Sequence, residues 1–154
     1  MSRAERGGAE EPLRVAFVCV ENAGRSQIAA ALAERERDRR GLDGAVEVRS
    51  GGTAPAEHVH DVVVRAMAEL DVDISGRRPR EIPREELLDV DVVVTMGCSA
   101  DDVCPATWRG DARDWGLDDP ADRPLEEVRG IRDEIAERVA DLFDEMERGV
   151  VSRA

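Results

Sequence analysis

The sequence predicts an α/β protein, a three-layer sandwich in which a four-stranded parallel sheet is flanked by helices. Two observations lead to this prediction. Short apolar, β-branched segments alternate along the chain with segments whose apolar residues recur every three or four positions, the period of a helix. Parallel strands need such crossover connections, and the resulting sheet is covered on both faces. Ligands of such sheets bind beyond the carboxyl ends of the strands.

The first predicted strand, Leu13 to Val20, is the clearest of the elements. It is an apolar run interrupted once, as expected for a strand that is covered on both faces. From Arg25 onward the chain turns to helix formers, with Ile28 and Leu32 four residues apart on one face. A short loop therefore joins the first strand to the first helix.

The remaining elements continue this alternation. Three more strands are expected, at Ala45–Arg49, Val90–Met96 and, more weakly, Asp111–Trp115. Three more helices are expected, at Val59–Leu70, around Glu85–Leu88 and from Pro124 onward. Proline suits the first position of a helix, and the last helix carries the longest apolar stripe, from Leu125 to Met146.

The loop after the first strand carries a cysteine, five further residues and then Arg-Ser. Backbone N–H groups converge at a helix N-terminus, and the helix dipole adds partial positive charge, so this position suits a tetrahedral oxyanion. We expect Cys19 to react there as a thiolate, Arg25 to hold two anion oxygens, and Ser26 to hydrogen-bond the sulfur. The residues expected to bind the oxyanion or support the loop are Val20, Glu21, Asn22, Ala23, Gly24, Arg25 and Ser26.

These residues resemble the low-molecular-weight protein tyrosine phosphatase superfamily and, within it, most of all the thiol-coupled arsenate reductases. The resemblance extends from about Leu13 to Phe143. Its nucleophile motif matches at Cys19, Asn22, Arg25 and Ser26, and further family segments follow in order at Ser50–Thr53, Asp71–Ser75, Val94–Cys98 and Asp114–Pro120. The resemblance implies the low-molecular-weight phosphatase fold, a loop braced by Asn22, and Asp119 as the general acid.

Two further cysteines suggest a relay of three thiols. Cys98 follows the third predicted strand, on the same rim as Cys19, and Cys104 comes after five intervening residues. In this hypothesis Cys19 attacks arsenate while Asp119 protonates the departing oxygen. Cys98 then forms a disulfide with Cys19 and releases arsenite, and Cys104 takes over the disulfide for an external reductant. This spacing differs from that of the most similar family members, so Cys98 as a core residue and Cys104 as a free thiol remain the alternative.

Three functions compete. Arsenate reduction uses all three cysteines. A phosphatase acting on phosphotyrosine or small phosphomonoesters through a Cys19 phosphocysteine would leave Cys98 and Cys104 without a task. It would also lack an aromatic ring after Pro120, where Ala121 stands. A non-enzymatic sensor could use the thiols as ligands for an oxyanion or metal, but it would not need an acid or an arginine fork.

Charge is the second unusual feature of the sequence. The formal net charge is −13, all 22 basic residues are arginine, and there is no lysine or tyrosine. An acidic surface without lysine suits concentrated salt, which screens carboxylate repulsion, and this composition predicts a halophilic source. GC-rich codon usage is the alternative explanation. The charge argues against nucleic-acid binding, which needs a basic stripe.

The chain is expected to form a single domain over residues 13–148, with flexible termini at 1–12 and 149–154. No apolar run reaches membrane-spanning length and no basic-plus-apolar leader is seen, so a cytoplasmic monomer is expected. Three cysteines in such a protein indicate thiol chemistry rather than a disulfide framework. No bound cofactor or metal is expected. The expected partner is an external thiol reductant, namely thioredoxin, glutaredoxin or a small thiol.

Overall fold

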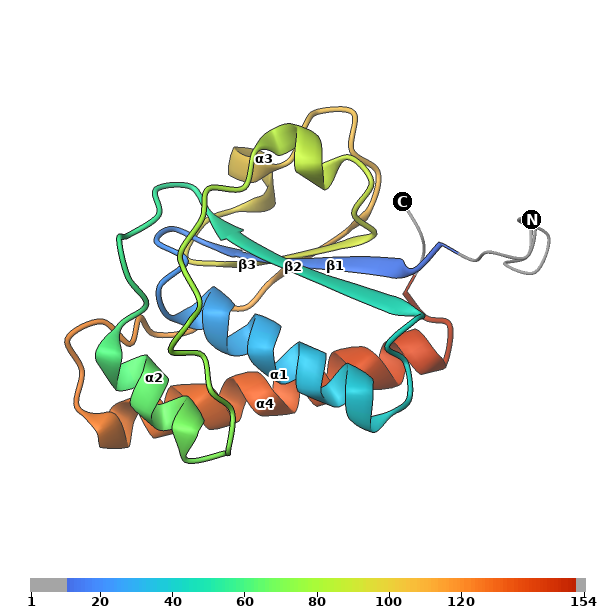
Figure 1. The fold of residues 1–154 in the computed structure, drawn as a ribbon. Helices are drawn as coiled ribbons and strands as arrows, with labels where there is room; N and C mark the ends of the chain where they lie inside the picture. The colour runs from blue at the N-terminus through green and yellow to red at the C-terminus, as the bar shows by residue number, and fades with distance from the viewer. Residues whose placement is uncertain (1–10, 152–154) are drawn as a thin grey trace.

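The structure, a computed structural model, describes residues 11–151 and contains a four-stranded sheet in the order β2-β1-β3-β4, in which all pairs are parallel (Figure 1). The predicted fold class is confirmed. The strands are β1 (Leu13–Cys19), β2 (Val46–Gly52), β3 (Val92–Met96) and β4 (Asp111–Asp114). The helices are α1 (Arg25–Arg39), α2 (Asp61–Ala68), the 3₁₀ helix η2 (Arg84–Leu87), α3 (Ala100–Val103) and α4 (Leu125–Glu147).

Strand β1 lies inside the sheet and brings Cys19 to the middle of one edge. The register pairs Cys19 with Gly52 on β2 and with Met96 on β3. Because all three strands run the same way, their carboxyl ends meet at this edge, where ligands of parallel sheets bind.

Helices α1, α2 and α4 cover one face of the sheet (Figure 1). The first half of α1 is almost entirely buried, because its run of Ala29, Ala30 and Ala31 allows the helix to approach the sheet and α4 closely. The larger apolar core lies here. Phe17, Ile28 and Phe143 are among its largest fully buried side chains. Burying such a side chain contributes roughly 1.5–3 kcal/mol each, so this face supplies much of the stability.

The other face of the sheet is covered more thinly, by η2, α3 and their connections (Figure 1). A smaller apolar cluster lies beneath them, and Cys98 packs against it. Its members are Ala16, Val18, Ile82, Leu87, Val90, Val93, Val103 and Cys104.

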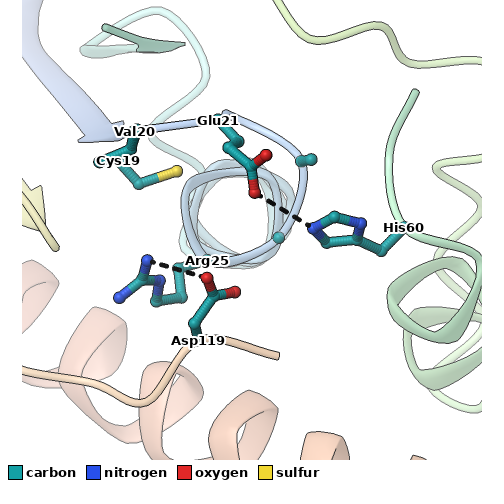
Figure 2. Close-up of a pocket in the computed structure, with 8 residues that line it drawn as sticks. Cys19, Val20, Glu21, Arg25, His60 and Asp119 are labelled. Atoms are coloured by element: carbon teal, nitrogen blue, oxygen red, sulfur yellow. Dashed lines mark ion pairs between the residues drawn. The ribbon is translucent and has the colours of Figure 1, made fainter. Parts of the chain in front are cut away.

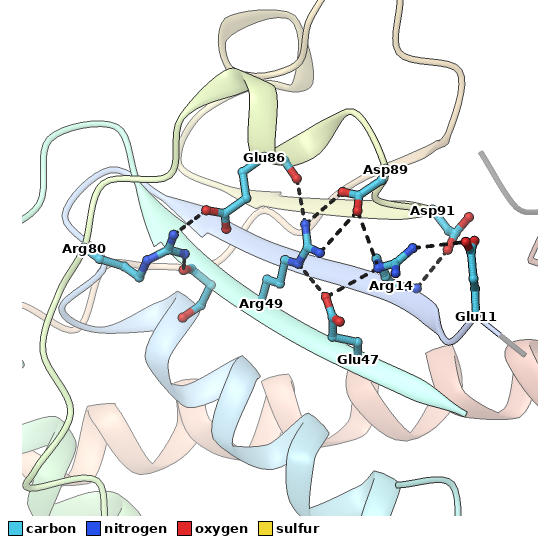
Figure 3. A network of polar contacts seen from close by, with 9 residues as sticks. Glu11, Arg14, Glu47, Arg49, Arg80, Glu86, Asp89 and Asp91 are labelled. Atoms are coloured by element: carbon cyan, nitrogen blue, oxygen red, sulfur yellow. Dashed lines mark hydrogen bonds and ion pairs between the residues drawn. The ribbon is translucent and has the colours of Figure 1, made fainter. Parts of the chain in front are cut away.

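A network of ion pairs and hydrogen bonds (Arg14, Glu47, Arg49, Glu86 and Asp89) lies over strands β1 and β2 on this face (Figure 3). Arg49 donates to the Glu47 carboxylate at 2.6 Å, to the Asp89 carboxylate at 2.9 Å and to the Glu86 backbone carbonyl at 2.8 Å. The hydrogen bond from Arg49 holds the pKa of Asp89 below its usual value. Charged side chains thus cover this part of strands β1 and β2.

Strands β1, β3 and β4 are one or two residues shorter than predicted, and three other elements differ more. Strand β2 extends through Gly52, because backbone pairing with β1 does not depend on the side chains of Ser50 to Gly52. Helix α2 is shorter than predicted at both ends. Helix α3 was not predicted, since four residues are too few to show a helical period.

Of the expected flexible termini, residues 1–10 and 152–154 lie outside the described residues. Val151, which is described, is buried and joins the larger core, so packing continues past residue 148. Among the helices of residues 11–151, none has both the length and the apolar character needed to cross a bilayer.

Candidate active site

The loop between β1 and α1 is folded so that its carbonyl groups point away from the site. Four consecutive contacts from segment 53–60 hold it. Backbone N–H groups of Thr53, Ala54, Ala56 and His60 donate to the carbonyls of Cys19, Val20, Glu21 and Ala23 at 2.8–3.3 Å. In a trans peptide the N–H points opposite to the carbonyl. The loop amides therefore turn to the other side, where α1 begins and an oxyanion would be bound.

Asn22 has a φ of 51°, in the left-handed region that is costly for a residue with a side chain. Its side chain is fully buried, donates to Ser26 Oγ at 2.7 Å and accepts the backbone N–H of Arg80 at 3.1 Å. These contacts hold the strained turn.

Cys19, a residue that is 3% exposed, places its sulfur at the base of this loop. The sulfur is 2.8 Å from Ser26 Oγ and accepts the backbone N–H of Asn22 at 3.2 Å. Two polar hydrogens can therefore approach one sulfur.

Arg25 is held by groups that come from distant parts of the chain. Its Nη1 donates to the Leu117 carbonyl at 3.0 Å, and its Nη2 lies 3.8 Å from Asp119 Oδ2. Gly97, with a φ of +85°, packs against the guanidinium, and a Cβ atom there would come within 2.8 Å of it. A glycine at the end of β3 thus lets the arginine lie flat beside the sheet edge.

These residues line a pocket of about 240 Å³ (Figure 2). Its walls are formed by Cys19, Val20, Glu21, Ala23, Gly24, Arg25, His60 and Asp119. Figure 2 shows the Cys19 sulfur and Arg25 on one side, with His60 on the other. His60 Nε2 lies 3.9 Å from Glu21 Oε1 at the rim. The pocket is small and has no Phe, Tyr or Trp side chain in its lining, which suits an inorganic oxyanion.

Asp119 reaches the pocket from the loop before α4, and its side chain is half exposed. Its Oδ1 accepts the Ala121 backbone N–H at 2.9 Å, and Oδ2 faces Arg25. Asp118, its neighbour in sequence, does not line this pocket but faces two other surface hollows. The geometry therefore separates the two carboxylates and leaves Asp119 as the candidate acid.

Gly24 lies where the loop that carries Asp119 meets the loop between β1 and α1. A Cβ at Gly24 would lie 2.7 Å from a Pro120 side-chain carbon and 3.5 Å from the His60 ring. Gly52 is equally constrained, since a Cβ there would lie 2.4 Å from the Val20 carbonyl oxygen. Both glycines permit close approach of backbone and neighbouring side chains around the pocket.

Cys98 lies next to this site on the same edge of the sheet. It is partly buried, and its sulfur lies 3.7 Å from the carbonyl of Val18, one residue before Cys19. Burial, and then the nearby Cys19 sulfur, raise the pKa of Cys98 above its usual value. Cys104 is at the end of α3 and is buried in the smaller apolar cluster. None of the three cysteines forms a disulfide here.

Sequence reasoning missed Gln27, Leu117 and Gly97 as contributors to the site. Gln27 follows the motif directly but reads as one polar residue in a helix. Leu117 acts through its backbone carbonyl, which no side-chain pattern reveals.

Within residues 11–151, no three His, Cys, Asp or Glu side chains are grouped in a way that could hold a metal ion.

The sequence and the fold were compared with those of known proteins. The model of the low molecular weight phosphotyrosine protein phosphatase family matches residues 14–152. A protein of Halobacterium salinarum named "Putative arsenate reductase" is 53% identical over 137 residues, which cover 89% of this chain and 95% of the relative.

Two solved structures have similar folds. The thioredoxin-dependent arsenate reductase of Corynebacterium glutamicum superimposes with a TM-score of 0.73 at 34% identity, covering 90% of this chain. The present chain spans only 64% of that protein. An arsenate reductase in its phosphate-binding state has a TM-score of 0.72 at 31% identity, covering 86% of this chain and 97% of the other. By the family match over residues 14–152, this chain belongs to the low molecular weight phosphotyrosine protein phosphatase family.

Proposed function

We propose that this protein is an arsenate reductase that works through a relay of Cys19, Cys98 and Cys104. The observation that supports this most directly is the position of Cys98, whose sulfur lies 3.7 Å from the carbonyl that precedes the Cys19 residue. A phosphatase has no use for a second thiol beside its nucleophile. The relatives named as arsenate reductases support the same assignment.

In the first step the Cys19 thiolate forms a bond to the arsenic of arsenate. One arsenate oxygen departs as water after Asp119 donates a proton to it. Arg25 and the loop amides bind the remaining oxygens, where the positive guanidinium balances their charge.

In the second step Cys98, as a thiolate, attacks the Cys19 sulfur. The sulfur–arsenic bond breaks, and its electron pair stays with arsenic, which is thereby reduced and leaves as arsenite. The product is a Cys19–Cys98 disulfide. Because the pKa of Cys98 is raised, we expect this step to be slower at lower pH.

In the third step Cys104 attacks Cys98, frees Cys19 and moves the disulfide to the pair Cys98–Cys104. Helix α3 lies between these two residues. The four helical residues rise about 6 Å and the extended Ser99 adds about 3 Å, whereas the Cα atoms of a disulfide lie about 6 Å apart. Helix α3 must therefore unwind, which would also bring the buried Cys104 to the surface for a reductant.

The reductant is proposed to be thioredoxin-like, as the description of the Corynebacterium relative says of that enzyme. Such a relay needs reducing surroundings, so we propose a cytoplasmic location. The acidic surface without lysine supports a source rich in salt.

A phosphatase remains the second candidate, because the same Cys19, Arg25 and Asp119 could hydrolyse a phosphomonoester. The decisive experiment compares arsenate and para-nitrophenyl phosphate as substrates in molar salt with a thioredoxin recycling system. Arsenate-dependent oxidation of the reductant that is abolished in Cys19→Ser and Cys98→Ser would support the relay. Phosphate release that needs Cys19 but not Cys98 would instead identify a phosphatase.

A further inference from the structure

We propose that Gln27 is a positioning residue that fixes the hydrogen-bond direction at the Cys19 sulfur. The inference rests on the proposed role of Cys19 as the nucleophile. Gln27 is in the first turn of α1 and is only 2% exposed. The residues that follow it in that turn pack into the apolar core. A buried amide in such surroundings is costly unless its hydrogen bonds are made.

The Gln27 side chain makes two hydrogen bonds, both to Asn22. Its Nε2 donates to the Asn22 backbone carbonyl and to the Asn22 Oδ1, each at 3.0 Å. A backbone carbonyl can only accept a hydrogen bond. The group that faces it must therefore be the NH₂ of the Gln27 amide, and its orientation is determined.

The orientation of the Asn22 amide is determined in the same way from the other side. Its Oδ1 also lies 3.1 Å from the backbone N–H of Arg80, which can only donate. The atom between Gln27 and Arg80 is thus an oxygen that accepts two hydrogen bonds. The Nδ2 of Asn22 must then face Ser26, whose Oγ accepts from it at 2.7 Å.

The consequence reaches Cys19. Because Ser26 Oγ accepts from Asn22, its own proton is free to point to the Cys19 sulfur, 2.8 Å away. The Asn22 backbone N–H donates to the same sulfur at 3.2 Å. With both partners donating, the sulfur accepts two hydrogen bonds, and a proton on the sulfur would find no acceptor in either partner.

Gln27 also supports the strained backbone at Asn22. This residue has a φ of 51° and is completely buried, and Gln27 is the donor to its carbonyl. If Gln27 cannot donate, the buried Asn22 carbonyl loses this hydrogen bond. The loop can then relax out of the left-handed conformation. Gln27 therefore acts through Asn22 and Ser26 and does not itself line the pocket.

The test measures the rate of iodoacetamide alkylation of Cys19 as a function of pH. A parent carrying Cys98→Ser and Cys104→Ser leaves Cys19 as the only thiol. Gln27→Met keeps the side-chain volume but removes the donor, and we expect the pH midpoint of alkylation to rise by about one unit. That corresponds to a rate about tenfold lower below the midpoint.

The matched control is Ile28→Val, which removes one buried methylene from the next residue of α1 without touching a polar contact. Its midpoint is expected to equal that of the parent. If Gln27→Met does not fold, as judged by circular dichroism, Gln27→Asn shortens the amide by one methylene and is expected to raise the midpoint too.

A midpoint in a folded Gln27 variant that equals that of the parent would overturn the inference while leaving arsenate reduction intact. A parent whose Cys19 reacts no faster than a free cysteine at neutral pH would remove the nucleophile itself. In that case both the inference and the proposed function fail, so the two failures are distinguishable.

Discussion

The cradle that holds Cys19 and the segment that holds Cys98 and Cys104 differ in how firmly they are fixed. The cradle, residues 19–26, is tied by hydrogen bonds to segment 53–60, to Arg80 and to its own helix. The segment 98–104 contains one four-residue helix, α3, which begins with a capping box between Ser99 and Asp102. The cradle is held by hydrogen bonds from three directions, whereas segment 98–104 is held mainly by apolar packing and by one hydrogen bond from Arg84 to the Asp102 carbonyl.

This difference matches what each region is proposed to do. An oxyanion site gains from donors that are already in place and do not rearrange during the reaction. A disulfide that must move from one cysteine pair to another needs a segment that can unwind cheaply. Helices of one turn are marginal without tertiary packing, so α3 is suited to that movement.

The strongest test of the comparison removes Cys104, the last thiol of segment 98–104. In Cys104→Ser, steady-state arsenate reduction with thioredoxin is expected to be lost, because the Cys19–Cys98 disulfide can no longer be passed on. One arsenite per enzyme should still form, and mass spectrometry of peptides should show the Cys19–Cys98 disulfide. Full steady-state turnover in this variant would exclude Cys104 from the relay.

A change in the firm region should act differently. Arg25→Lys keeps the charge but loses the planar fork, so kcat/KM for arsenate is expected to fall roughly 100- to 1000-fold. The disulfide chemistry of Cys98 and Cys104 should be unchanged when it is driven by a chemical oxidant. Arg35→Lys, also on α1 but outside the pocket, is the control and should keep kcat/KM near that of the unmodified protein.

The reactivity of Cys98, in segment 98–104, should depend strongly on pH. The pKa of Cys98 is raised by burial and by the Cys19 sulfur, so its thiolate fraction grows about tenfold per pH unit up to that pKa. In Cys104→Ser, alkylation of Cys98 should follow this rise and remain slow at neutral pH. Cys19→Ser in the same background should lower the midpoint for Cys98, and an unchanged midpoint would mean that the two sulfurs do not interact.

The smallest effect is expected from loosening α3 itself. Ser99→Ala removes the capping box, at a cost of about 1 kcal/mol to the helix. Formation of the Cys98–Cys104 disulfide under mild oxidation should become about fivefold faster, whereas the melting temperature of the protein should hardly change. Ser75→Ala, in a turn far from α3 in sequence, provides the matched control. Slower disulfide formation in Ser99→Ala would show that α3 assists the pairing.

Much of this site could be predicted because it is local in sequence. The strand, the loop and the helix N-terminus that hold Cys19, Arg25 and Ser26 are consecutive, and apolar runs and helix formers mark their boundaries. Strand polarity then brings Cys98 to the same edge, because the carboxyl ends of neighbouring parallel strands coincide.

Other parts were decided only when distant segments came together. The Asn22 amide is oriented by a backbone N–H that is 58 residues away, and Arg25 is held by a carbonyl that is 92 residues away. Backbone donors and acceptors are the same in every residue, so no residue pattern announces which of them will meet. The residues that determine the chemistry of Cys19 thus lie in its own loop. The direction of the hydrogen bonds around its sulfur is instead set by the packing of segments that are distant in sequence.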